Sequence, residues 1–421
     1  MRFIFLLGVS LFTMPAWAEK THAQDVLTLS TPLTLEQTVD LAAVHAPQIQ
    51  AGQYKQASAA ADSDRSGRLP DPQLQFGVQN LDAQGPGAFN PNADFMTMRF
   101  VGISQDIPSF AALAAQRAKA NANQGAAEAD TQNAQYQAKH DAAVAWVNLW
   151  AAQQADSLLI TLKTQNKIAI AIAQAHLAGA TGSATDVLAT RAASIELDNQ
   201  LDAMHGDEQQ AMASLARWIK LERITLASPP DFSQLMVPEN RLLGQPDTQA
   251  PLLGWSPRIH AAEAELQRAQ ASKQPDWNVG FSYGVRAPGL PALTSLQVGM
   301  RLPIFADHRE NKDIDARNAD LAALRANHDD ALLAQIESIQ RTLARWHSLT
   351  TQIIRDETNL LPLAHDRAVT ALAAYRHGGA LQPWLDARSA EINTNLTYVN
   401  LLATRALAWV DLAYLIQEPQ Q

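Results

Sequence analysis

Four short segments of the chain alternate apolar residues with polar or small ones, which is the pattern of β-strands with two unlike faces. The pattern predicts strands at about 72–82, 95–107, 276–286 and 294–304. In the first two segments we assign Phe76, Met96, Met98 and Phe100 to the apolar face. In the third, the apolar positions are Trp277, Val279, Phe281, Tyr283 and Val285.

Long helical stretches follow each pair of strands. The sequence predicts a long helix at about 110–177 with a return helix at about 186–220, and a second long helix at about 307–376 with a return helix at about 382–414. At a rise of 1.5 Å per residue the long helices reach roughly 100 Å. They are alanine-rich and polar over much of their circumference, which favours a hollow helical barrel over a solid bundle. A dimeric coiled-coil rod is the alternative, but it leaves the strands unexplained.

The same order of elements occurs twice. The first repeat covers 19–226 and the second 253–416, with a proline-rich connector at 227–252 and a short tail at 417–421. Several residues match between the repeats: Pro70 with Pro275, Pro108 with Pro303, Trp146 with Trp346, Gly179 with Gly378, and Arg191 with Arg388. An ordered set of matches indicates internal duplication.

The first residues have the features of a secretory signal. A positive start at Arg2, an apolar run and the small residues Ala16 and Ala18 predict a signal peptide at 1–18. A membrane anchor is the alternative, but an apolar core of about ten residues is too short to span the bilayer.

Composition excludes several kinds of function. The net charge of −10 argues against a nucleic-acid surface, and the absence of cysteine excludes disulfides, thiolate metal sites and a lipidated cysteine. The 11 histidines form no His-x-His or His-Glu-x-x-His motif. We therefore predict no metal site, no cofactor and no catalytic residue, and expect that the protein is not an enzyme.

The strands point to a membrane. A soluble antiparallel sheet is the commoner source of such alternation, but here the polar faces are rich in glycine and amides while the apolar faces carry aromatic residues. Four strands cannot close a barrel, and an open edge in lipid leaves backbone groups without partners. Closure must be shared between copies, and three copies of four strands give twelve.

Two stretches resemble a known family. They are Arg68-Leu69-Pro70-Asp71-Pro72 before the first strand and the run from Met96 to Pro108. The chain resembles the TolC-like outer-membrane factors, and among them the CzcC-like components of heavy-metal efflux. That branch usually continues after Pro108 with a Gly-Lys-Arg type run, whereas this chain reads Ser109-Phe110-Ala111-Ala112-Leu113.

The resemblance implies a predominantly α, mixed α+β membrane protein. It would be a homotrimer in the outer membrane, with a twelve-stranded β-barrel in lipid and an α-barrel extending into the periplasm. A periplasmic adaptor protein and an inner-membrane RND pump would be its partners. Its function would be a passive exit duct for heavy-metal cations or small toxic compounds. A periplasmic coiled-coil tether without transport, or a periplasmic hydrolase, remain as alternatives.

The two turns between helices are the candidate functional tips. Glycines there allow tight reversals, and the resemblance places adaptor contact at these tips and a ring of aspartates near the second one. Asp386 matches the ring by motif and Asp186 is its counterpart, although Asp186 also fits a helix N-cap. The position three before Asp386 is Pro383, where relatives are often acidic. The residues expected at the tips are Gly179, Gly182, Gly378, Gly379, Arg191 and Arg388.

Overall fold

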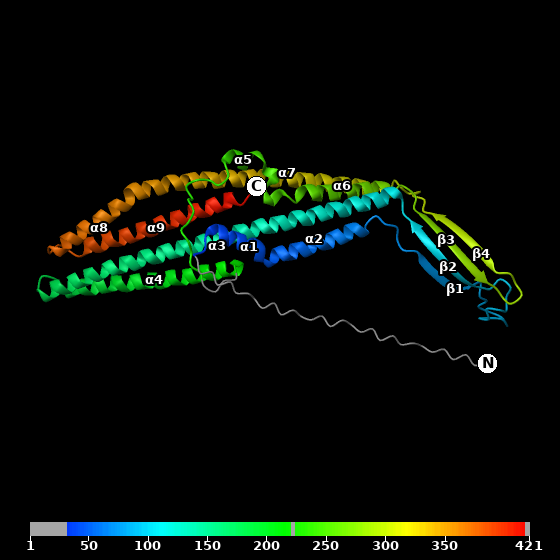
Figure 1. The fold of residues 1–421 in the computed structure, drawn as a ribbon, viewed down its shortest axis with the longest axis horizontal. Helices are drawn as coiled ribbons and strands as arrows, with labels where there is room; N and C mark the ends of the chain where they lie inside the picture. The colour runs from blue at the N-terminus through cyan, green and yellow to red at the C-terminus, as the bar shows by residue number, and fades with distance from the viewer. Residues whose placement is uncertain (1–31, 220–223, 417–421) are drawn as a thin grey trace.

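The computed structural model describes residues 32–219 and 224–416, so the predicted signal peptide at 1–18 and tail at 417–421 lie outside the described residues. The molecule is long and narrow, with a small sheet at one end and helices parallel to the long axis over the rest (Figure 1). No helix in the described part of the chain combines the length and the apolar character needed to cross a bilayer.

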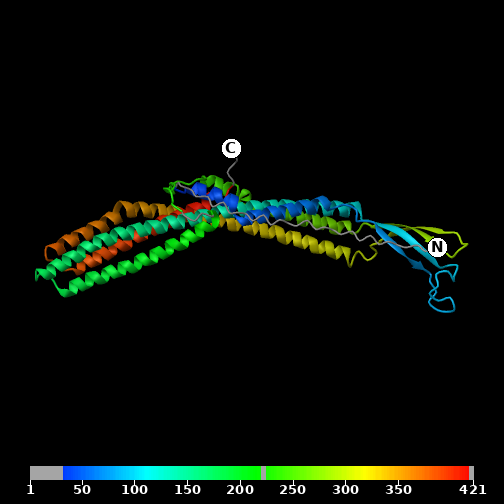
Figure 2. The same ribbon diagram turned by 60° about the horizontal axis from the view of Figure 1, so that its bottom comes forward.

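The helix α3, Phe110–Ala178, runs through most of the helical part as one uninterrupted helix of 69 residues. Its N-terminus is capped by Ser109, whose Oγ accepts a hydrogen bond from the Ala112 amide at 3.2 Å. Two shorter helices lie along it, α2 (Pro47–Arg65) on the half nearer the sheet and α4 (Ala184–Ile219) on the other half (Figure 2). The α1 helix, Leu35–His45, packs against α3 where these two meet.

The second half of the chain repeats this arrangement. The α6 helix (Trp255–Ala271) lies along α7 near the sheet, and α9 (Gln382–Ala413) lies along α7 and α8 farther away. The α6 helix begins at Trp255, two residues before Pro257. The connector contains α5 (Glu239–Gly244) and the short 3-10 helices η1 (Pro246–Thr248) and η2 (Ala250–Leu252).

The sequence predicted one uninterrupted second long helix at about 307–376, but the structure divides this stretch into three parts. It consists of α7 (Glu310–Arg355), a π-helical turn η3 (Asp356–Leu360) and α8 (Leu361–Arg376). Pro362 at the start of α8 has no amide hydrogen, and the Leu361 amide donates to the Asp356 carbonyl, five residues back. The wider turn thus keeps the chain helical through a proline.

The sheet has four antiparallel strands in the order β1-β2-β3-β4: Gln73–Gln79, Met98–Ile107, Trp277–Val285 and Leu293–Met300. The first and last strands end earlier than the alternation predicted, so Leu302 and Ile304 lie beyond β4. The outer edges of β1 and β4 have no partner strand in the described chain.

One face of the sheet is apolar. Directly paired residues in an antiparallel ladder project to the same side. One row across the sheet is Leu74, Ile103, Phe281 and Leu296. All four are exposed, Leu296 to 72%. The opposite face carries glycine, serine and glutamine, with the row Gln75, Gly102, Ser282 and Ser295.

The register corrects our assignment of Phe100 and Met98 to the apolar face. Phe100 pairs with Gly77 and Gly284, so it lies on the glycine-rich face, and Val101 takes the apolar position. A Cβ atom added at Gly77 would lie 3.2 Å from the Phe100 ring, and one at Gly284 would lie 2.7 Å from the Met98 sulfur. The large side chains fill space that the glycines leave open. Met96 lies before β2 begins.

The main hydrophobic core is at mid-length, where the short helices meet. It contains Trp146, Trp218, Trp346, Trp409 and Phe232, and Phe232 packs its ring against Trp409. The repeat-matched tryptophans make equivalent bonds. Trp146 donates from Nε1 to the Leu33 carbonyl at 3.0 Å, and Trp346 donates to the Phe232 carbonyl at 3.1 Å. Each thus fixes a segment outside the helices against its long helix.

Candidate functional site

The two helix-to-helix turns lie together at the end of the molecule opposite the sheet (Figure 1). A small apolar cluster joins them: Ala169, Ala173, Val187, Tyr375, Leu381 and Trp384. His176 packs its ring edge to face against Tyr375, with the centroids 5.0 Å apart. Both residues lie three positions before the matched glycines Gly179 and Gly378, so the repeats meet through equivalent residues.

The turns use their glycines differently from what the sequence suggested. Gly378 has a φ of +92°, as expected for a tight reversal. Gly179 has a φ of −81°, and the following Ala180 takes the positive value of +56°. At Gly182 the reason for glycine is space, because an added Cβ would lie 2.7 Å from the His176 Cβ. Gly379 is similar, with the Ala374 carbonyl oxygen 2.8 Å from an added Cβ.

Asp186 does not cap its helix. The α4 helix begins at Ala184, and Ser183 before it accepts a hydrogen bond from the Thr185 amide at 2.9 Å. Asp186 is half-buried in the first turn, where its charge is favourable at a helix N-terminus. Burial, followed by the nearby charge of Asp186, raises the pKa of Tyr375. The phenol oxygen of Tyr375 has no hydrogen-bond partner among the described residues.

Asp386 is exposed near the start of α9 and accepts a hydrogen bond from Gln382 Nε2 at 2.8 Å. An exposed carboxylate here is available to a neighbouring copy or to a cation. Which way it faces in an assembly stays a prediction, as does its role with Asp186.

Arg191 and Arg388 have different environments although their positions match. Arg191 is exposed, whereas Arg388 is only 7% exposed. Arg388 donates to Glu391 Oε2 at 2.6 Å and to the Leu162 carbonyl at 3.3 Å, and Glu391 Oε1 lies 2.9 Å from His365 Nδ1. Arg388 therefore joins α3, α8 and α9 inside one chain. Its contact with an adaptor stays a prediction.

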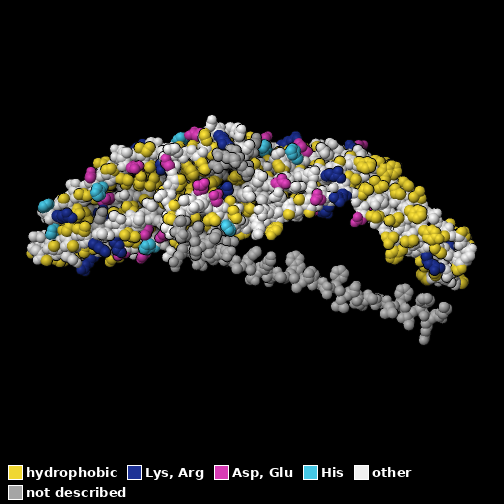
Figure 3. Space-filling view, in the orientation of Figure 1, with side chains coloured by type: hydrophobic (Ala, Val, Ile, Leu, Met, Phe, Trp, Pro, Cys, Tyr) yellow, Lys and Arg dark blue, Asp and Glu magenta, His cyan; other side chains and the backbone are white. Residues whose placement is uncertain are grey.

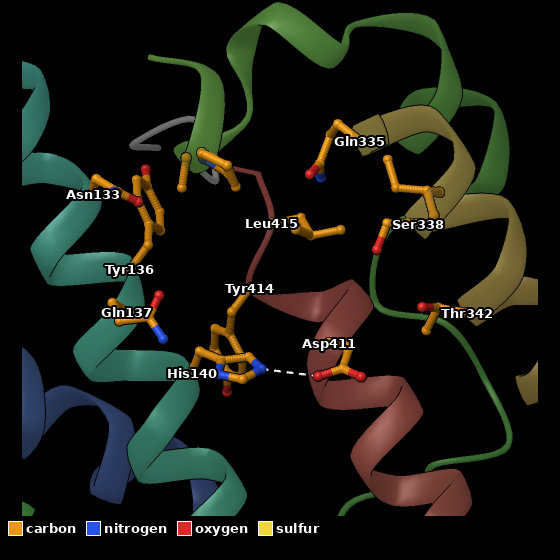
Figure 4. A pocket seen from close by; sticks show the side chains of 13 residues that line it. Asn133, Tyr136, Gln137, His140, Gln335, Ser338, Thr342, Asp411, Tyr414 and Leu415 are labelled. Carbon is orange, nitrogen blue, oxygen red and sulfur yellow. Dashed lines mark hydrogen bonds and ion pairs between the residues drawn. The ribbon is translucent and has the colours of Figure 1, made fainter. Parts of the chain in front are cut away.

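A polar cavity lies at mid-length and was not predicted from the sequence (Figure 4). The cavity of about 310 Å³ lies between α3, α7 and the end of α9. His140 Nε2 lies 2.9 Å from Asp411 Oδ1, and its Nδ1 lies 3.1 Å from Asp141 Oδ1. The Asp411 hydrogen bond, opposed by burial and helped by Asp141, raises the pKa of His140. No sequence motif links these residues, which come from helices far apart in the chain.

No group of three or more His, Asp or Glu side chains is placed to hold a metal ion within residues 32–219 and 224–416. Both imidazole nitrogens of His140 contact aspartates of the chain. Beside His365, both carboxylate oxygens of Glu391 contact protein side chains. The polar clusters in the helical part therefore connect helices.

No family model matches the chain, and no curated protein matches it. The fold, however, is shared with solved outer-membrane channels. The channel CusC has a TM-score of 0.77 at 16% identity, over 91% of this chain and 91% of that chain. VceC from Vibrio cholerae has a TM-score of 0.73 at 18% identity, over 90% and 94%. MtrE from Neisseria gonorrhoeae, solved in an open state, has 0.71 at 15%, over 90% and 88%.

These likenesses cover nearly the whole of each chain and establish a TolC-like fold. CusC and MtrE are described as channels, and VceC as an outer membrane protein. At such low identity the likeness concerns the fold, and the function of this chain has to be argued from its own surfaces.

Proposed function

We propose that the chain is one subunit of a trimeric outer-membrane channel that serves a tripartite efflux system as a passive exit duct. The observation that carries the proposal is a four-stranded sheet whose apolar face is exposed and whose two edges have no partner strand among the described residues. Phe76 is 81% exposed on this face. In water, a lone copy would expose this apolar face to solvent. In lipid, the backbone groups along its two sheet edges would have no hydrogen-bond partners.

Identical copies solve both difficulties. If β4 of one copy pairs with β1 of the next, three copies give a closed cylinder with the apolar face outward to lipid and the glycine-rich face inward. The α3 helix, with 69 residues, would extend roughly 100 Å from this cylinder. The likeness to solved channels supports this arrangement.

The partners and the cargo follow from the resemblance noted in the sequence. A periplasmic adaptor would bind the helix tips near Gly182, Gly379 and the exposed Arg191, and an inner-membrane RND pump would supply the energy. Asp386, with Asp186 nearby, would line the entrance and attract cations. The motif from Met96 to Pro108 supports heavy-metal cations or small toxic compounds as the exported class.

Planar-bilayer recording of the purified protein tests the channel directly. Discrete conductance steps, together with recovery of the protein in the outer-membrane fraction, are the expected result. A protein that fractionates as a soluble species and gives no conductance would instead be a tether of the envelope, and the proposal would be wrong.

A further inference from the structure

A second cavity lies in the helical part close to the sheet, where α2, α3 and α6 run side by side. It has a volume of about 350 Å³. Its polar lining consists of the cations Arg65, Lys119 and Arg268, the carboxylate Asp62, and the neutral side chains Ser66, Gln116 and Asn123. Figure 3 shows Lys and Arg side chains gathered over these helices, next to the sheet and on the same side of the molecule as the apolar side chains that cover it.

The cations retain free donors. Arg65 uses Nε for Asp62 at 2.7 Å, and its two terminal nitrogens have no partner in the described chain. Arg268 uses Nη1 for a long 3.5 Å contact with Glu265, which also binds Lys119. Arg65 and Arg268 are exposed to 79% and 62%. Three cations thus share two carboxylates, leaving a net positive charge.

A further arginine adds to this charge. Arg117 donates from Nη2 to the Gly67 carbonyl at 3.1 Å, directly after the end of α2. Burial raises the pKa of Glu265, but Lys119, Arg268 and Arg317 outweigh burial, so the net shift is downward. Lys119 and Arg268, which lower the pKa of Glu265, also line the cavity, and their charges favour a negative group beside them.

The mid-length cavity provides an internal comparison. At about 310 Å³ it has a similar size, but neither Lys nor Arg lines it, and its charged members are His140 and Asp411. Cationic lining is thus a property of the cavity near the sheet and is absent from the other. Planar guanidinium groups and an ammonium that converge on one space suit a phosphate-type oxyanion, which accepts several charge-assisted hydrogen bonds.

We propose that Arg65, Lys119 and Arg268 bind a phosphate group. The position of the cavity favours a lipid headgroup as the source. Lys119 lies nine residues after Phe110, about 14 Å along α3, and Phe110 and Phe305 at the sheet-to-helix junction are exposed apolar side chains. This step rests on the proposed function: with the sheet in the bilayer, long basic side chains below the apolar rim reach the headgroup layer of the near leaflet.

The test uses the full-length protein purified in a neutral detergent, with three probes. These are phosphatidylglycerol, a diacylglycerol glycolipid that has no phosphate, and inorganic phosphate. The variant Arg65→Gln/Arg268→Gln changes two exposed side chains, and Arg341→Gln/Arg355→Gln on α7 is the control with the same change in charge. Binding is measured by native mass spectrometry for the lipids and by calorimetry for phosphate.

We expect Arg65→Gln/Arg268→Gln to weaken phosphatidylglycerol binding by about tenfold, and the control by less than about twofold, with the glycolipid unaffected. If inorganic phosphate competes with phosphatidylglycerol, and Arg65→Gln/Arg268→Gln no longer binds inorganic phosphate, the site accepts free phosphate as well as the lipid headgroup. Phosphate binding without lipid binding would support the cavity and overturn the headgroup as its source.

Equal binding by both variants, or no binding of lipid or phosphate by the unchanged protein, would overturn the proposal. The phosphate measurement does not need a channel. A protein that bound phosphate through this cavity but formed no channel would therefore contradict the proposed function and leave the site standing.

Discussion

The imidazole of His176 packs edge to face on the ring of Tyr375, 5.0 Å between centroids, and so ties the first helical hairpin to the second at the tip. The residues are equivalents in the two repeats, each three positions before a matched glycine. The duplicated sequence thus makes contact with itself at the point where a channel of this fold would open.

Substitutions of Tyr375 test this contact. The phenol oxygen is buried without a partner, so Tyr375→Phe should leave local stability unchanged or raise it by up to about 1 kcal/mol. Tyr375→Ala removes a ring that is only 1% exposed and should cost about 3–5 kcal/mol. Hydrogen exchange of α8 and the adjoining turn measures the difference. Equal exchange in the two variants would show that the ring does not hold the hairpins together.

The matched tryptophans should behave alike. Trp146→Phe and Trp346→Phe each remove one indole hydrogen bond to a carbonyl at mid-length, at a cost of about 1–3 kcal/mol in thermal or denaturant unfolding. Trp277→Phe in β3 is the control, because its side chain is partly exposed on the sheet. A large loss from one core substitution and none from the other would argue against equivalent roles.

The His140 pair predicts a dependence of stability on pH. Asp411 raises the pKa of His140 in the folded protein above its usual 6.5, so the pair stabilises fully below that value and loses its contribution as the pH rises through the raised pKa. Asp411→Asn should therefore lower the free energy of unfolding more at about pH 6 than at about pH 9. The difference should be less than about 1 kcal/mol, because the pair is half exposed. A difference that does not change with pH, or grows toward alkaline pH, is the contrary result. Asp330→Asn, which changes an exposed aspartate on α7, is the control.

The proposed entrance predicts an effect on conduction. Asp386→Ala should raise single-channel conductance and weaken block by divalent cations, because it removes the carboxylates that three copies would bring together. Asp330→Ala, an exposed aspartate on α7, serves as the control. Unchanged conductance and block in Asp386→Ala would remove Asp386 from the entrance.

The alternation of residues was sufficient to predict the strands but not always their faces. Phe100 and Val101 are adjacent and both apolar, so periodicity alone does not decide which one belongs to the apolar row. The decision depends on pairing: Val101 lies opposite Phe76 and Tyr283, while Phe100 lies opposite two glycines. The information is therefore in the neighbouring strands, which a local pattern does not include.

At the helix tips, too, the sequence predicts some contacts and not others. The repeat offset that matched Gly179 with Gly378 also matches His176 with Tyr375, so this contact was within reach of the sequence. The burial of Arg388 was not, because it depends on Leu162 and Glu391 from two other positions in the fold, and its counterpart Arg191 is exposed. Duplicated residues keep their positions but not their environments.

Closure of the sheet by identical copies is the central claim, and the mass of the detergent-solubilised protein tests it most directly. Because the outer edges of β1 and β4 have no partner strand in the described part of one chain, native mass spectrometry should find three copies in one complex. A complex that remains a single copy under conditions that preserve the fold would contradict the account.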